Sequence, residues 1–460
     1  MSLDVRNLIY GACPRALRPF WKRVESSDVG SRLARGAFWS LAGAMISRGL
    51  MLIASILVAR ILGQAGYGEF AMVRSTVNMF VIFAGFGLGM TATKHVAELY
   101  KPDPERAGRI MALSGLFAFV SGACVSLAVF AFAPWLAAKT INAPHLTPVL
   151  RIGAFILFIN ALNGAQTGAL AGFEAFKTIA KVNFGVGLAS FPLMVGGAYW
   201  GGIYGAIWAL LLNMAINWLL NHLALRKVSA QNGVPFSLHN CTSEWSILWQ
   251  YSLPAALGGF IVSPALWVCN AFLVNQPGGY AQMGIFEAAN QWRIAILFIP
   301  SMVGQVVFPL MSNLLGADQN DKYLKVLKYN VLLNGVCSLI VAVFVSVLGP
   351  WILRSYGKGF EDGYWVLVLL VSSAVLIAIN QVVGQAIASR GKMWIGLSFN
   401  ILWALALIGF SAFFLFRGYG ALGLSIAYFM SYLLHSLWQG IYAWNTIKSR
   451  DSRKIASDIL

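Results

Sequence analysis

The sequence contains a series of apolar runs, each long enough to cross a lipid bilayer. A spanning helix needs about 20 mainly apolar residues, because only helices and closed barrels satisfy their own backbone hydrogen bonds in hydrocarbon. The ten-residue alternation of a membrane β-barrel is absent from the sequence. The pattern predicts an all-α membrane protein of about 12 transmembrane helices, at roughly 36–62, 68–90, 109–131, 148–170, 181–200, 203–224, 247–272, 282–309, 326–348, 363–388, 394–416 and 420–445.

Composition and motifs argue against several classes of protein. Hydrophobic residues make up 58% of the 460 residues and charged residues 11%, against about 25% charged in an ordinary soluble domain. This excludes a soluble globular protein. The sequence has no GxxxxGK[ST], HExxH or GxSxG motif and no loop long enough for a separate catalytic domain, so an enzyme is not expected. The five cysteines form no CxxC pair, so neither a metal site nor a cofactor is expected.

The basic residues predict the orientation. The net charge is +17, which on a soluble chain would suggest nucleic acid. Placed on the predicted spans, however, 24 of the 33 Lys and Arg residues fall on the side of the two termini, four on the opposite side and five inside spans. Because basic loops stay in the cytoplasm, we expect cytoplasmic N and C termini and no nucleic-acid partner.

The two halves of the sequence resemble each other. Three landmarks recur at offsets of 213, 216 and 215 residues: Gly66-Tyr67 with Gly279-Tyr280, Pro134-Trp135 with Pro350-Trp351, and Tyr204-Gly205-Ala206 with Tyr419-Gly420-Ala421. The repeat therefore predicts two parallel six-helix lobes. Transporters built in this way hold their substrate between the lobes, which rock against each other. The predicted organisation is a basic arm at 1–35, a first lobe at 36–224, a linker at 225–246, a second lobe at 247–445 and a basic tail at 446–460.

Three arginines are predicted to line a central cavity. Arg48 and Arg293 lie about 11 residues from the nearer span end, or about 16 Å deep, where insertion costs about 2.5–3.5 kcal/mol. Arg74 is at intermediate depth. Such arginines persist where they face a wet cavity or an anion. Arg60 and Arg151 are secondary candidates, because both lie near span ends and can extend to the interface.

Acidic residues inside the spans are fewer. Glu287 is the repeat mate of Arg74 at the offset of 213, with Asn290 and Gln291 on its helical face. We hypothesise that Arg74 and Glu287 form a contact between the lobes that opens during transport. A static structural ion pair is the alternative. Glu287 and Glu69 are the candidates for ion coupling or a gate.

The cavity residues indicate the charge of the substrate. Three guanidinium groups offer planar, permanently charged donors that suit phosphate. A multidrug or cation antiporter of the same fold would favour acidic groups, and it remains one alternative. A non-transporting membrane scaffold for polysaccharide assembly is the other. The sequence favours an anionic, phosphate-bearing substrate.

A stretch near the N-terminus resembles a known family. Ser40-Leu41-Ala42, Leu57-Val58-Ala59-Arg60-Ile61-Leu62-Gly63, Ala65-Gly66-Tyr67-Gly68-Glu69-Phe70 and Gly85-Phe86-Gly87-Leu88-Gly89 are similar to the signature of Wzx-type oligosaccharide flippases. These flippases belong to the multidrug/oligosaccharidyl-lipid/polysaccharide (MOP) exporter superfamily, which has the MATE fold.

The resemblance implies a function and a location. It implies a flippase that moves an undecaprenyl-pyrophosphate-linked oligosaccharide, a precursor of O-antigen or exopolysaccharide, across the bacterial cytoplasmic (inner) membrane, coupled to an H⁺ or Na⁺ gradient. Central basic residues of the family engage pyrophosphate or acidic sugars, and Arg48 and Arg74 occupy comparable positions. The expected partners are the lipid-linked oligosaccharide, membrane lipids and the polymerase and assembly proteins of polysaccharide synthesis.

Overall fold

The computed structural model describes residues 28–457 except 238–240, 249–251, 253–259 and 318, with side chains described from Met45 to Ala443 outside those gaps and 305, 306 and 309. Every regular element in this part of the chain is a helix. The α-helices are α3 (Asp28–Gly85), α4 (Leu88–Leu99), α5 (Pro104–Trp135), α6 (Thr147–Gly172), α7 (Phe176–Gln231), α9 (Val262–Val274), α10 (Gly279–Ile296), α11 (Phe298–Gly316), α12 (Asn320–Tyr356), α13 (Tyr364–Ser389), α14 (Met393–Phe416) and α15 (Gly420–Ser457).

Short helical turns connect several of them. These are η2 (Leu136–Thr140), η3 (Pro144–Leu146), η4 (Cys241–Glu244) and η6 (Phe360–Gly363). Helix α7 continues to Gln231, so the predicted linker at 225–246 begins as helix. Residues 1–27 of the predicted arm and much of the start of the predicted span at 247–272 lie outside the described residues.

Two long helices fold back on themselves at glycines. Helix α3 has left-handed φ at Gly63 (φ 70°), and α7 has it at Gly202 (φ 54°), a backbone conformation that glycine adopts without a Cβ penalty. The Ser55 and Tyr67 hydroxyls, 12 residues apart, lie 2.6 Å from each other across the first break. In a straight helix 12 residues span about 18 Å, so the chain reverses at Gly63. Gly197 and Gly205 are in direct backbone contact across the second break.

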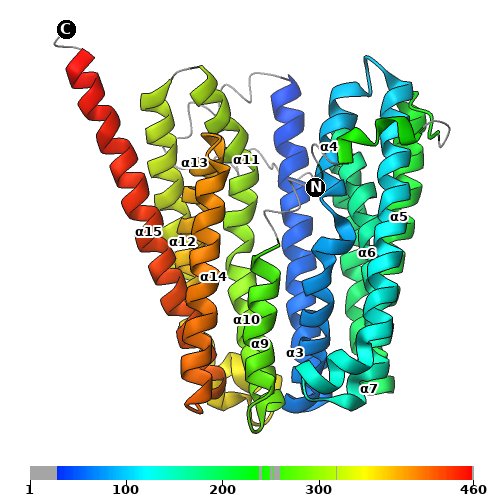
Figure 1. Cartoon of the computed structure of the whole chain (residues 1–460), viewed down its shortest axis with the longest axis vertical. Coiled ribbons are helices and arrows are strands. Elements are labelled where there is room, and N and C mark those ends of the chain that lie inside the picture. Colours follow the sequence, from blue (N-terminus) through cyan, green and yellow to red (C-terminus); the bar gives the residue numbers. More distant parts are fainter. Residues whose placement is uncertain (1–27, 238–240, 249–251, 253–259, 318, 458–460) are drawn as a thin grey trace, which may run out of the picture.

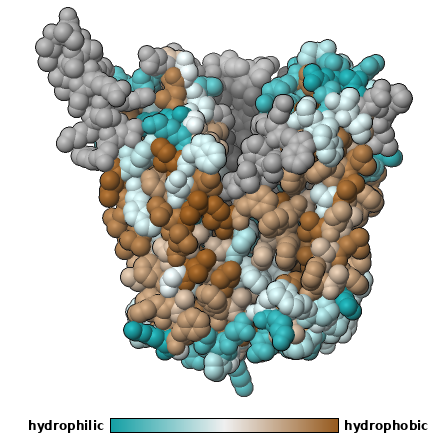
Figure 2. Space-filling view, viewed as in Figure 1, coloured by the Kyte–Doolittle hydropathy of each residue, from teal (hydrophilic) through white to brown (hydrophobic). Residues whose placement is uncertain are grey.

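The helices form two groups that meet mainly through α3. Helices α3 to α7 pack together, as do α9 to α15, and α3 packs against α9, α10 and α12 of the second group. Figure 1 shows the groups side by side, with the start of α3 and the end of α15 at the same end of the molecule. Figure 2 shows a broad apolar band between hydrophilic ends.

Eight helical stretches among the described residues are long and apolar enough to cross a membrane. Two of these, Met45–Leu99 and Phe176–Gln231, have 55 and 56 residues. A straight helix of that length would be about 80 Å long, far more than the bilayer core of about 30 Å, and each stretch contains one of the glycine reversals. The number of crossings and the side of the termini remain predictions.

The two groups are joined closely at the end of the molecule away from the start of α3. The Tyr280 hydroxyl donates to the Ile141 carbonyl oxygen at 2.7 Å, and the Asn275 amide donates to the Thr140 carbonyl oxygen at 2.7 Å. Beside them α3 and α10 touch through their backbones, where a Cβ on Gly68 would overlap the Tyr280 carbonyl oxygen. Glycine is therefore required at Gly68 for this closure.

Packing inside the first group gives a stability prediction. A Cβ on Gly168 of α6 would overlap the Gly89 carbonyl of α4, whereas a Cβ on Gly164, one turn away, meets nothing within 4 Å. We expect Gly168→Val to destabilise the protein by about 1–3 kcal/mol through overpacking and to lower its melting temperature in detergent. Gly164→Val is the matched control, and equal melting temperatures for the two variants would contradict the packing.

Candidate functional site

An ion pair joins the two groups of helices near mid-depth. Arg74, on the returning leg of α3, donates from Nη2 to Oε1 of Glu287 on α10. Arg74 lies 11 residues after the reversal at Gly63, or about 16 Å along the helix. The Glu287 side chain is 6% exposed and that of Arg74 is 31% exposed. The contact predicted from the repeat offset is confirmed.

Two amides on α10 hold the Glu287 carboxylate. Asn290 Nδ2 donates to Glu287 Oε2 at 3.0 Å, and Gln291 Nε2 donates to Oε1. These residues lie three and four positions after Glu287, where side chains share a helical face. Glu287 therefore accepts from three side-chain donors, Arg74, Asn290 and Gln291.

Arg293 is connected to this pair through Asn290. Its Nε donates to Asn290 Oδ1 at 2.8 Å. Its guanidinium also lies 5.3 Å from the centre of the Tyr428 ring of α15, a cation–π arrangement. The side chain is buried within the second group, so it extends the polar chain that begins at Arg74.

Arg48 faces the same region from the first leg of α3. It is half-buried and close enough to Arg74 for their like charges to repel. Within the described part of the chain no side chain donates to, accepts from or ion-pairs with it. The four charged residues of this central group, Arg48, Arg74, Glu287 and Arg293, thus comprise three guanidiniums and one carboxylate. The excess positive charge suits a multiply charged anion.

The structure adds polar contacts that sequence reasoning missed. Ser75 and Thr76 follow Arg74 on α3 and also bond to the second group: Asn270 Nδ2 donates to Ser75 Oγ at 2.9 Å, and Trp267 Nε1 donates to Thr76 Oγ1 at 3.0 Å. Both partners lie on α9. Three consecutive residues of α3 therefore make polar contacts between the groups.

Aromatic hydroxyls surround Glu287 as well. Tyr67 and Tyr356 are both fully buried and close enough to Glu287 to interact electrostatically with it. The Trp292 indole donates to the Tyr356 hydroxyl at 3.1 Å. In the sequence, Tyr67 stood out only as part of the Gly66-Tyr67 repeat landmark and of the stretch that resembles the flippase family, and neither signal placed it beside Glu287.

Three candidates from the sequence lie elsewhere. Glu69 pairs with Nε2 of His145 at 2.8 Å, in η3 of the first group, and not with the central group. Arg60 is exposed beside Gly357, in the turn after α12. Arg151 is exposed, with its guanidinium 5.0 Å from the centre of the Phe130 ring of α5. The positions of Arg60 and Arg151 agree with interfacial arginines. The role of Glu69 in ion coupling or a gate stays a prediction.

Comparisons with known proteins agree with this architecture. The family model described as polysaccharide biosynthesis protein matches residues 33–315. The chain is 25% identical to the EPS I polysaccharide export inner membrane protein EpsE of Ralstonia nicotianae over 413 residues, covering 87% of this chain and 91% of the relative. It is 23% identical to the lipid III flippase of Escherichia coli over 434 residues, covering 89% and 98%.

A solved structure shows the fold. An inward-facing multidrug resistance MATE family transporter of the MOP superfamily matches with a TM-score of 0.72 and 16% identity, covering 87% of this chain and 95% of that one. The protein has the MATE/MOP transporter fold and is a multi-pass inner-membrane protein, and its relatives are transporters rather than enzymes. With more than half of its length matched, the chain belongs to the polysaccharide biosynthesis protein family.

Proposed function

We propose that the protein is a flippase that moves an undecaprenyl-pyrophosphate-linked oligosaccharide from the inner to the outer leaflet of the cytoplasmic membrane. The names of the relatives, a polysaccharide exporter and a lipid III flippase, support this class of substrate. The single observation that carries the proposal is the central group itself, in which three guanidiniums gather around a single carboxylate and only that of Arg74 pairs with it. A cation antiporter would place the opposite excess of charge there.

The proposed transport is alternating access between two six-helix lobes with twelve crossings and cytoplasmic termini. The helices run between two ends, and the basic loops gather at the end where α3 begins and α15 ends. A substrate entering from that side meets the closure formed by Gly68, Tyr280 and Ile141 at the other. Export requires this closure to open after the cytoplasmic side has closed.

The Arg74–Glu287 pair supplies the proposed coupling step. A diphosphate that approaches Arg74 competes with the Glu287 carboxylate for the same guanidinium donors. Release from Arg74 would free a Glu287 oxygen to take up a proton, so that binding of the anionic headgroup and proton uptake accompany each other.

Reconstitution tests the proposal through Arg48. Losing a hydrogen bond to a charged group costs about 1.5–3 kcal/mol, so we expect Arg48→Gln to slow transbilayer movement of a labelled polyprenyl-diphosphate oligosaccharide by roughly tenfold to hundredfold. Arg151→Gln removes an equally basic residue outside the central group and should transport like the wild type. The assay is loss of label from the inner leaflet of proteoliposomes.

The competing functions predict different outcomes for Arg48→Gln. Equal movement in protein-free vesicles would contradict the flippase. Transport of a lipophilic cation that survives Arg48→Gln would favour the antiporter. A scaffold would support polysaccharide assembly in cells with Arg48→Gln and lose it when a cytoplasmic loop is deleted.

A further inference from the structure

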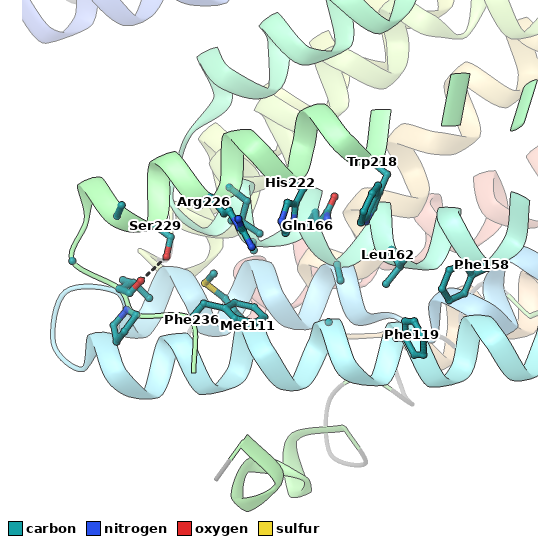
Figure 3. Close-up of a pocket in the computed structure, with 18 residues that line it drawn as sticks. Met111, Phe119, Phe158, Leu162, Gln166, Trp218, His222, Arg226, Ser229 and Phe236 are labelled. Carbon is teal, nitrogen blue, oxygen red and sulfur yellow. Dashed lines mark hydrogen bonds between the residues drawn. The ribbon is translucent and has the colours of Figure 1, made fainter. Parts of the chain in front are cut away.

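The first group of helices contains a groove that none of the four charged residues of the central group lines. It is a groove of about 940 Å³ between α5, α6 and the last third of α7, shown in Figure 3. Its size is near the upper end of the range of ligand sites, about 300–1,000 Å³. Phe119, Phe158, Leu162 and Trp218 line one part of it, and His222 and Arg226 lie toward the end of α7.

The part of the groove beside Phe119 and Phe158 is apolar and open. Phe119 of α5 is 53% exposed, and its ring packs edge to face on that of Phe158 of α6 at 5.1 Å. A Cβ on Gly115, which also lines the groove, would meet nothing within 4 Å. In a protein that spans a membrane, an open apolar wall of this kind faces hydrocarbon chains rather than water.

The polar side chains of the groove differ in whether they already have partners. The Gln166 amide, oriented to satisfy both its atoms, donates to the Trp218 carbonyl and accepts from the Trp218 indole, each at 3.1 Å. His222 stacks on the Trp218 ring at 5.7 Å. Arg226 is exposed and has no hydrogen-bond or ion-pair partner in the described part of the chain. It is the one permanently charged side chain of the lining.

We propose that this groove binds one anionic phospholipid, with a chain lying along Phe119 and Phe158 and its phosphate at Arg226. Apolar walls with a single cation at one end complement a lipid with one anionic headgroup. Under the orientation given in the proposed function, the groove opens to the cytoplasmic leaflet, which is rich in such lipids.

The position of the groove favours a resident lipid over the transported one. Contacts between the two groups of helices run mainly through α3, whereas α5, α6 and α7 wall the groove. A lipid held there can stay in place while the lobes move. The inference therefore concerns a site beyond the proposed transport path, and it can fail while the flippase proposal stands.

Native mass spectrometry of the purified full-length protein tests the headgroup contact, with phosphatidylglycerol and phosphatidylcholine as probes. We expect phosphatidylglycerol to bind more tightly than phosphatidylcholine and Arg226→Gln to weaken its binding by about fivefold. Lys227→Gln removes the adjacent exposed charge, which does not line the groove, and should leave binding unchanged. Equal weakening by both variants, or equal binding of both lipids, would overturn the proposal.

A second pair of variants tests the apolar part. Gly115→Phe should fill the groove and abolish phosphatidylglycerol retention, whereas Gly409→Phe on α14, where a Cβ also meets nothing within 4 Å, should not. Melting temperatures of the two variants report whether each folds. If polyprenyl diphosphate binds with the same dependence on Arg226 and Gly115 and displaces phosphatidylglycerol, the groove belongs to the transported lipid and the proposal is wrong.

Discussion

Replacing Arg74 by leucine should destabilise the protein by about 3–5 kcal/mol, because it leaves the buried Glu287 carboxylate without the cation that compensates its charge. The Glu287 carboxylate, 6% exposed, would keep only the amides of Asn290 and Gln291 as donors. Replacing both partners by leucine removes both charges, and we expect most of the stability to return. The measurement is the free energy of unfolding of the single and double variants.

The same variants separate a moving contact from a static one. We expect the double leucine variant to recover stability but not transport, since neither the phosphate donor nor the proton acceptor remains. A charge swap, Arg74→Glu with Glu287→Arg, should recover part of the transport that each single swap loses. Recovery of full transport by the double leucine variant would identify a static structural pair, and a swap that restored nothing would argue against any functional pairing.

The ion pair could be predicted because the duplication carries positional information. Arg74 and Glu287 occupy equivalent places in the two halves, 213 residues apart. In a protein with two related lobes, equivalent helices tend to face each other across the pseudo-symmetry axis. Their opposite charges at matched depth then suggested a contact, and the structure contains it.

The neighbours of that pair could not be predicted in the same way. Asn270 and Trp267 contact Ser75 and Thr76, but nothing in the sequence says which face of α9 meets α3. Polar residues in spans serve bonds between helices as readily as substrate, so composition alone does not rank them. The partner of Glu69 could not be predicted either, because His145 lies in a connecting turn, 76 residues away in the sequence.

The positions of the apolar helices were more predictable than their boundaries. The predicted span at 68–90 ends in the structure at Gly85, where Phe86 and Gly87 adopt positive φ, and the chain continues as α4. The predicted span at 282–309 is divided at Leu297 between α10 and α11. Apolar runs report which residues lie in hydrocarbon, whereas breaks inside them depend on how neighbouring helices pack.

Substituting Gly68 should open the closure away from the start of α3. Its Cβ would overlap the Tyr280 carbonyl oxygen and come within 2.9 Å of the Gly284 nitrogen. Both are backbone atoms, which cannot rotate aside as a flexible side chain could. Gly68→Leu therefore requires α3 and α10 to separate at this end. Overpacking of about 1–3 kcal/mol would shift the balance between closed and open states by roughly fivefold to more than hundredfold.

Cysteine labelling measures that shift. A cysteine at Ser55, about 12 Å along α3 from the reversal at Gly63, lies behind the closure and beside Tyr67. In a background without the five native cysteines, Gly68→Leu should speed its reaction with a membrane-impermeant maleimide added from outside, and transport should fall. Gly85→Leu on the same helix meets nothing within 4 Å and should label like the parent. Equal labelling of both glycine variants would mean that access from outside is controlled elsewhere than at the contact of α3 with α10.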